Sequence, residues 1–117
     1  MTLNEIAVSL DLQALTRAPK ESLESGITKA HASDLLSDVL ANAPSGGVLL
    51  TIQVHLNVIA VAVHAMQAAV IFTSGMVPED SVRQRAIAEG IPLFATKHST
   101  FDTAGKLYAL GIREQHG

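Results

Sequence analysis

Two short, continuous apolar runs constrain this 117-residue chain more than any other feature. They occupy residues 48–52 (Val-Leu-Leu-Thr-Ile) and 69–73 (Ala-Val-Ile-Phe-Thr), and both contain β-branched residues. A strand covered on both faces of a sheet has this composition, because neither face carries polar side chains. The stretch between the runs, residues 56–66, is about long enough for the crossover that joins two parallel strands. We therefore predict a strand–helix–strand unit.

The crossover stretch itself is ambiguous. Its valines and its isoleucine favour a strand, whereas its alanines favour a helix. Residues that are apolar on every side indicate burial in either case. We predict a helix from the topology and not from propensity, with Asn57 as a candidate N-cap.

The rest of the chain extends this unit. Thr2 and Glu5 have the spacing of a capping box and predict a helix over residues 3–10. Ser33 is the expected cap of a later helix, and Gly90 the expected end of another. We predict strands at 12–15, 27–30 and 93–96, a polar loop at 16–26, and a last helix, capped by Ser99 or Thr100, whose apolar stripe includes Phe101 and Tyr108. The predicted fold is a single α/β domain over residues 1–117, with a mainly parallel β-sheet and helices on both faces.

Composition excludes several classes of function. The formal charge is -3 and the eight Lys and Arg residues are scattered, which argues against nucleic acid binding. The chain has no cysteine, so it has no disulfides and no thiolate chemistry. No apolar run is long enough to span a membrane, and the N-terminus lacks the pattern of a signal peptide. We expect a cytoplasmic protein that does not contact membranes.

Polar side chains follow each of the three strands predicted around the crossover. Ligands of open parallel sheets bind beyond the carboxyl ends of the strands, so we expect these side chains to share one edge. Lys97 is the cation among them and favours a small anionic ligand. The predicted ligand-binding residues are Gln53, His55, Asn57, Thr73, Gly75, Thr96, Lys97 and Ser99.

Two further groups have a functional and a simpler interpretation. Asp34 and Asp38, one helical turn apart, could contact a cation or ribose hydroxyls, but a solvated acidic face is the favoured interpretation. His55 and His98 could act as general bases, although hydrogen-bonded rim histidines are commoner. The other histidines, at positions 31, 64 and 116, are expected at the surface or at helix ends.

Several chemistries have no support in the sequence. No histidine pair has metal-ligand spacing, and no glycine-rich phosphate loop or nucleophile elbow occurs. We therefore assign no metal site, no cofactor and no catalytic residue.

Five segments resemble the small bacterial DRTGG-domain proteins. They are residues 33–38 (Ser-Asp-Leu-Leu-Ser-Asp), 51–57 (Thr-Ile-Gln-Val-His-Leu-Asn), 75–79 (Gly-Met-Val-Pro-Glu), 90–93 (Gly-Ile-Pro-Leu) and 95–97 (Ala-Thr-Lys). The same domain is similar to the N-terminal domain of HPr kinase/phosphorylase, and the likeness covers about residues 26–111. The resemblance implies a mainly parallel α/β fold, a homo-oligomer and a regulatory or accessory role. The kinase reaction is not implied, because the P-loop domain has no counterpart here.

Three functions follow as hypotheses. The first is a non-catalytic regulatory module that binds a small anionic metabolite or nucleotide and assembles with itself or with a partner protein. The second is a small enzyme that uses His55 or His98 as the base and Lys97 as an electrostatic stabiliser. The third is a structural interaction subunit with the 56–66 helix partly in an interface.

Overall fold

The two apolar runs form neighbouring strands in the middle of the sheet. In the computed structural model, which describes residues 1–114, β3 (Val48–Thr51) pairs in parallel with β4 (Ala69–Phe72), and every residue of both strands is buried. The crossover between them is the helix α4 (Asn57–His64). The predicted strand–helix–strand unit is therefore confirmed, and topology was the correct guide where propensities were divided.

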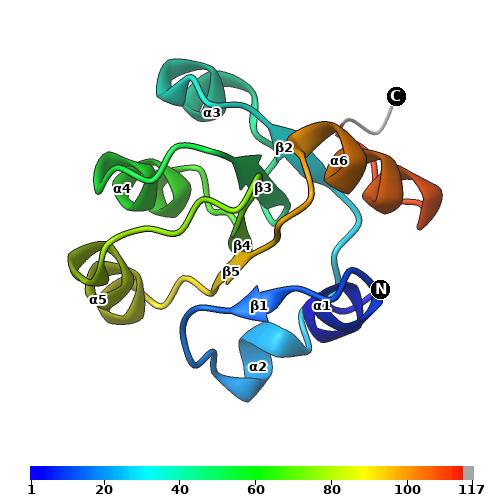
Figure 1. Cartoon of the computed structure of the whole chain (residues 1–117), viewed down its shortest axis with the longest axis horizontal. Coiled ribbons are helices and arrows are strands. Elements are labelled where there is room, and N and C mark those ends of the chain that lie inside the picture. The colour runs from blue at the N-terminus through cyan, green and yellow to red at the C-terminus, as the bar shows by residue number, and fades with distance from the viewer. Residues whose placement is uncertain (115–117) are drawn as a thin grey trace.

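Three further strands complete the sheet (Figure 1). They are β1 (Gln13–Ala14), β2 (Ala30–Ala32) and β5 (Leu93–Ala95), and the strand order is β1-β5-β4-β3-β2. Strands β2 to β5 are all parallel to their neighbours, whereas β1 pairs antiparallel with β5. The carboxyl ends of four strands thus lie along one edge of the sheet.

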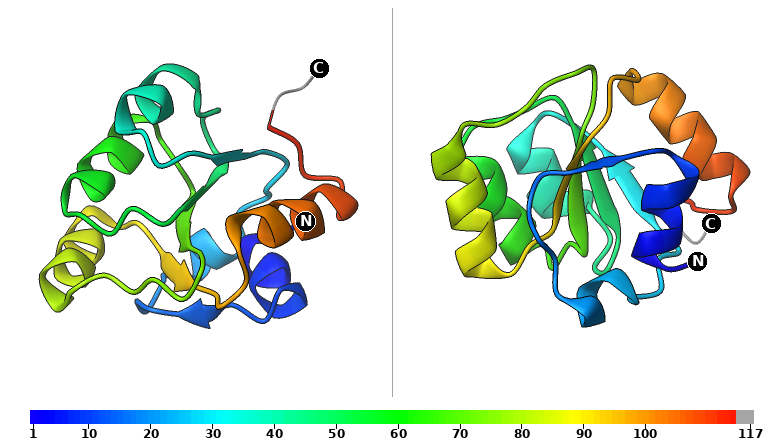
Figure 2. Two further views of the ribbon diagram at one scale, coloured as in Figure 1. Left: turned by 45° about the horizontal axis from the view of Figure 1, so that its top comes forward. Right: turned by 60° about the horizontal axis from the view of Figure 1, so that its bottom comes forward.

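Helices cover both faces of the sheet (Figure 2). On one face lie the crossover helices α3 (Leu36–Asn42), α4 and α5 (Asp80–Glu89), and on the other lie α1 (Leu3–Ser9) and α6 (Thr100–Ala109). The short helix α2 (Lys20–Leu23) connects β1 to β2. The predicted fold class, a mainly parallel α/β domain with helices on both faces, is confirmed.

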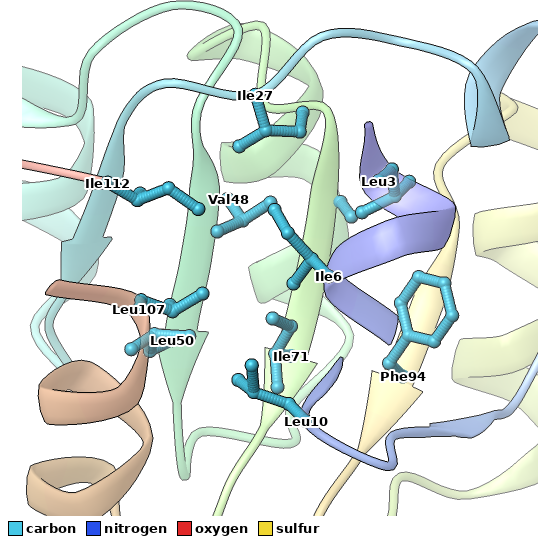
Figure 3. Packing of buried hydrophobic residues seen from close by; sticks show 11 residues of the cluster. Leu3, Ile6, Leu10, Ile27, Val48, Leu50, Ile71, Phe94, Leu107 and Ile112 are labelled. Carbon is cyan, nitrogen blue, oxygen red and sulfur yellow. The ribbon is translucent and has the colours of Figure 1, made fainter. Parts of the chain in front are cut away.

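The core has two halves, one on each face of the sheet. Successive side chains of a strand point to opposite faces, so β3 sends Val48 and Leu50 to one half and Leu49 to the other. Figure 3 shows the half in which α1 and α6 pack on the sheet through Leu3, Ile6, Leu10 and Leu107. Short strands with few aromatic residues still contribute to a buried core, because each strand is covered on both faces.

The predicted helix caps and helix ends are confirmed where the residues involved lie within one helical turn of each other. Thr2 Oγ1 accepts a hydrogen bond from the Glu5 N–H (3.1 Å), and Glu5 Oε1 accepts one from the Thr2 N–H (2.8 Å), which is the predicted capping box. Ser99 caps α6 by accepting from the Asp102 N–H at 3.0 Å. Gly90 ends α5 in a left-handed conformation (φ 75°).

Other predictions are corrected. The polar loop at 16–26 contains α2, which begins directly after Pro19. The predicted strand at 27–30 lies about three residues too early, because Ile27 donates its N–H to Met1 at the N-terminal segment and pairing with β3 begins at Ala30. The solvent side of α6 carries Phe101 and Tyr108, which were predicted in its apolar stripe and are exposed.

No helix within residues 1–114 is long and apolar enough to cross a lipid bilayer.

Candidate functional site

The loops that follow β3, β4 and β5 are tied together by backbone hydrogen bonds. Thr73 donates its N–H to the Thr51 carbonyl (3.1 Å), and Gly75 donates to the Thr96 carbonyl (3.0 Å). Ser74 donates to the His98 carbonyl at 2.7 Å. The strand ends therefore form one continuous edge, which we call the rim.

A cavity of about 380 Å³ lies at the β5 end of the rim. Three of the predicted residues line it, namely Gly75, Thr96 and Lys97, and His98 lies beside them. Lys97 is exposed and forms no ion pair within the described residues. Its ammonium group is therefore available to a ligand.

The same cavity contains two residues that sequence reasoning missed. Asp11 and Gln13 reach it because β1 pairs antiparallel with β5, with Gln13 opposite Ala95. The strand β1 is only two residues long, and no local pattern predicts the direction of such a short strand. A weaker signal existed, since Asp11 adopts φ 52°, a conformation that Asp tolerates better than most residues.

A second cavity, of about 390 Å³, lies where β3 ends. Gln53 and His55 line it together with Glu79 and Ser81, which come from the start of α5. The predicted residues are thus divided between two cavities, and Glu79 gives this second cavity an acidic wall. An anion is favoured at the Lys97 cavity instead.

The rim histidines are already engaged as hydrogen-bond acceptors. His55 Nδ1 accepts from the Asn57 N–H (3.1 Å), and His98 Nε2 lies 3.2 Å from Lys106 Nζ, which can only donate. In each neutral ring the remaining nitrogen then carries the proton. Neither ring presents a free lone pair to a substrate, so this geometry gives no support to a general base at the rim.

The remaining rim residues hold the loops in place. Thr73 is buried, and its hydroxyl is hydrogen-bonded to that of Thr100. Ser99 is the cap of α6, and Asn57 is the first residue of α4 and not its N-cap. None of the three is among the residues that line the two rim cavities.

Asp34 links the end of β2 to the end of β3 and so extends the rim to β2. Its Oδ1 accepts from the Thr51 hydroxyl and from the Ile52 N–H, both at 2.8 Å. Asp34 consequently lies outside the helix, and Ser33, the predicted cap, instead accepts from the Leu35 N–H while α3 begins at Leu36. The prediction that the two aspartates lie one helical turn apart is wrong.

Asp38 belongs to a separate cluster beside β2. It accepts from Asn42 Nδ2 at 2.7 Å and from His31 Nε2 at 2.8 Å. Hydrogen bonds from Asn42, Ser33 and His31, in that order, lower the pKa of Asp38 to about 2. Asp38 is thus ionised and occupied by its own neighbours.

His31 was predicted at the surface and is buried, with 4% of its area exposed. Its Nδ1 lies 3.3 Å from Glu114 Oε1, so the ring stands between two carboxylates. His64 is exposed at the end of α4, as predicted, and His116 lies outside the described residues. Within residues 1–114, no group of three His, Cys, Asp or Glu side chains could hold a metal ion.

Comparison with solved structures finds the same fold in a regulatory protein. A crystal structure of the CBS and DRTGG domains of the regulatory region of Clostridium perfringens pyrophosphatase, complexed with its activator diadenosine tetraphosphate, superposes with a TM-score of 0.75. The two sequences are 16% identical, and the match covers 91% of this chain and 45% of the other. The chain therefore corresponds to less than half of that regulatory region.

A search of curated proteins found no match. The family model of the DRTGG domain matches residues 27–110, which begin just before β2 and end just after α6. This span includes the four parallel strands and the entire rim, and it is most of the chain. The chain belongs to the DRTGG domain family.

Proposed function

We propose that this protein is a non-catalytic regulatory module that binds a small anionic ligand, a nucleotide in the first instance, at the Lys97 cavity. One observation carries the proposal: an exposed lysine that has no ion pair within residues 1–114 lines a cavity at the carboxyl ends of parallel strands, where ligands of such sheets bind. The regulatory character is supported by the DRTGG family and by the pyrophosphatase regulatory region with the same fold.

The groups around Lys97 suit a phosphate. His98 shares a hydrogen bond with Lys106, so a second ammonium group lies near the cavity. The helix α6 starts two residues after His98, and the N–H groups of Thr100 and Phe101 have no acceptor within the described residues. A helix of ten residues adds a partial positive charge at this end. Lys97 thus lines the cavity, Lys106 lies next to His98 in its wall, and α6 starts two residues after His98. Thr100 and Phe101 are not among the residues that line the cavity.

The opposite wall of the cavity suits the remainder of a nucleotide. Asp11 and Gln13 offer a carboxylate and an amide, which can pair with ribose hydroxyls or with the exocyclic amine of a base. A carboxylate would repel inorganic phosphate, so this wall favours a ligand with hydroxyl or amine groups beside its anionic part. Diadenosine tetraphosphate, the activator held by the pyrophosphatase regulatory region, has both kinds of group.

Assembly and location complete the proposal. We expect the chain to associate with itself or with a protein partner, as a module that reports ligand binding must. We place it in the cytoplasm, which agrees with a chain that has no cysteine. The alternatives are a small enzyme and a purely structural subunit, and the engaged lone pairs of His55 and His98 weigh against the enzyme.

Thermal unfolding with a panel of ligands tests the proposal. The panel contains AMP, ATP, diadenosine tetraphosphate and inorganic phosphate. A nucleotide at about 100 times its dissociation constant stabilises the fold by about 2.7 kcal/mol, which raises the melting temperature by about 10 °C. Inorganic phosphate at the same concentration gives a smaller shift.

Lys97→Gln removes the cation and is expected to abolish the nucleotide shift. The matched control is Lys20→Gln, because Lys20 is also an exposed lysine, lies on α2 and lines neither rim cavity. Its exposed ion pair with Glu24 contributes little to stability. A panel without any shift contradicts ligand sensing by nucleotides. A shift of equal size in wild type and Lys97→Gln contradicts the location of the site.

A further inference from the structure

The outer side of α6 is apolar where a solvent-exposed helix is usually polar. Phe101 is 86% exposed and Tyr108 is 61% exposed. They are seven residues apart and therefore lie on the same side of the helix, opposite the buried Thr103 and Leu107. With these exposed fractions, neither side chain is covered by another element of residues 1–114. Exposed aromatic residues on one side of a helix make that side a candidate interaction surface.

Gly105 lies between the two aromatic residues on this side. A Cβ atom at Gly105 would contact nothing within 4 Å, so the middle of the face is an open gap. A glycine in a helix interior costs about 1 kcal/mol relative to alanine, and no close contact within the described residues explains it here. A second helix can approach closely at this position.

We propose that this face binds a second copy of the chain, with two α6 helices packed antiparallel across a two-fold axis at Gly105. An interface between identical copies must be complementary to itself. Phe101 is one turn before Gly105, and Tyr108 is nearly one turn after it. The antiparallel arrangement therefore places each Phe101 near the partner's Tyr108, and aromatic pairs of this kind stabilise interfaces.

The two ends of this α6 face carry opposite charges, as an antiparallel pair of identical helices requires. The Arg113 guanidinium lies 3.7 Å from the centroid of the Tyr108 ring and donates to the Tyr108 carbonyl, so a positive charge is fixed at this end of α6. The Asp102 carboxylate, at the other end, forms no hydrogen bond or ion pair within the described residues. The two-fold axis places Asp102 of each copy opposite the partner's Arg113, so the interface contains two such ion pairs.

This interface rests on the self-association in the proposed function and not on ligand binding. It uses the outer side of α6, whereas the Lys97 cavity lies beyond the start of that helix. A single pair of helices buries less surface than a standard stable interface. We therefore expect a weak, concentration-dependent dimer.

Sedimentation equilibrium of the full chain, from about 1 to about 500 µM, measures this dimer. Phe101→Glu puts a charge in the interface and is expected to raise the dimer dissociation constant at least about tenfold. The matched control is Ile87→Glu, because Ile87 is exposed on α5, on the other face of the sheet (Figure 2), and the substitution is expected to leave dimerisation unchanged. Gly105→Gln fills the gap, so it weakens the dimer while it raises the melting temperature of the monomer.

A charge exchange tests the geometry directly. Asp102→Arg and Arg113→Asp each place like charges opposite one another and are expected to be monomeric alone. An equal mixture of the two variants restores both ion pairs, so it is expected to form a heterodimer.

The outcomes separate the proposals. A wild-type chain that stays monomeric at the highest concentration overturns this interface and self-association together, and leaves ligand binding and a different protein partner to be tested. A dimer that persists in both Phe101→Glu and Gly105→Gln overturns the α6 interface but not self-association. Monomeric mixtures of the two charge variants overturn the antiparallel arrangement.

Discussion

The two ends of the rim use their charged side chains in opposite ways. Next to β2, Asp34 at the rim and Asp38 on the neighbouring helix α3 together accept four hydrogen bonds from the chain itself. At the β5 end, Lys97 is exposed beside a cavity and has no ion pair within the described residues. The acidic residues therefore serve the fold, whereas Lys97 is free to meet the ligand that we propose. A stretch of polar residues after a strand predicts both uses equally well, and only the hydrogen bonds distinguish them.

The largest effect on stability is expected at His31, whose hydrogen bond to Asp38 links β2 to α3. His31→Ala removes a buried ring and leaves Asp38 without one of its donors, so we expect a loss of about 3 kcal/mol in the free energy of unfolding. Urea denaturation measures it. His64→Ala, at an exposed histidine on α4, is the control and is expected to stay within about 0.5 kcal/mol. Equal losses in the two variants would show that His31 has no special structural role.

A smaller effect is expected at Asp34. Asp34→Ala removes the acceptor of two hydrogen bonds and is expected to destabilise the fold by about 1 kcal/mol, a low figure because the side chain is exposed. Asp34→Asn retains one oxygen acceptor and is expected to lose less. Thermal unfolding of the two variants measures the difference. A ligand site at Asp34 would instead show itself as unchanged stability combined with a lost nucleotide shift.

The sequence predicted the fold where its signals are local. The runs that became β3 and β4 are short and apolar on both faces, and such runs have few other uses in a small domain. The Thr2–Glu5 box likewise needs only three residues of separation. The crossover helix followed from topology, because two parallel neighbours cannot be joined by a hairpin.

The site was predicted only in part because its partners are distant in sequence. Ser33 is an ordinary N-cap residue, yet α3 starts later, since Asp34 is held by Thr51 and Ile52 some seventeen residues away. The buried ring of His31 lies between Asp38 and Glu114, which come from α3 and the C-terminal segment. No periodicity in one sequence carries such pairings, whereas the rule for strand ends does place Lys97 correctly at the rim.

Acid titration sharpens the comparison at Asp38. Its pKa is about 2 in the fold, against an ordinary value of 3.8, so the unfolded chain binds a proton more readily. The contribution of Asp38 to stability is therefore complete above about pH 4 and disappears as the pH falls to about 2. We expect wild type to be more stable than Asp38→Asn at pH 6, and the difference to vanish near pH 2. A difference that is constant over this range would mean that the charge of Asp38 is not what stabilises the fold.

The smallest effect on stability is expected at Lys97, and it is the sharpest test of the comparison. Lys97→Gln removes no ion pair made within the described residues and changes an exposed side chain, so the ligand-free variant is expected to unfold within about 0.5 kcal/mol of wild type. Lys97→Gln is expected to differ from wild type only when nucleotide is present, because it lacks the stabilisation that nucleotide gives. Asp34→Asn is expected to keep that stabilisation and to be less stable than wild type without ligand. Urea denaturation with and without nucleotide separates the two cases. If both variants are destabilised without nucleotide and both are still stabilised by nucleotide, the division of the rim into a structural end and a binding end is wrong.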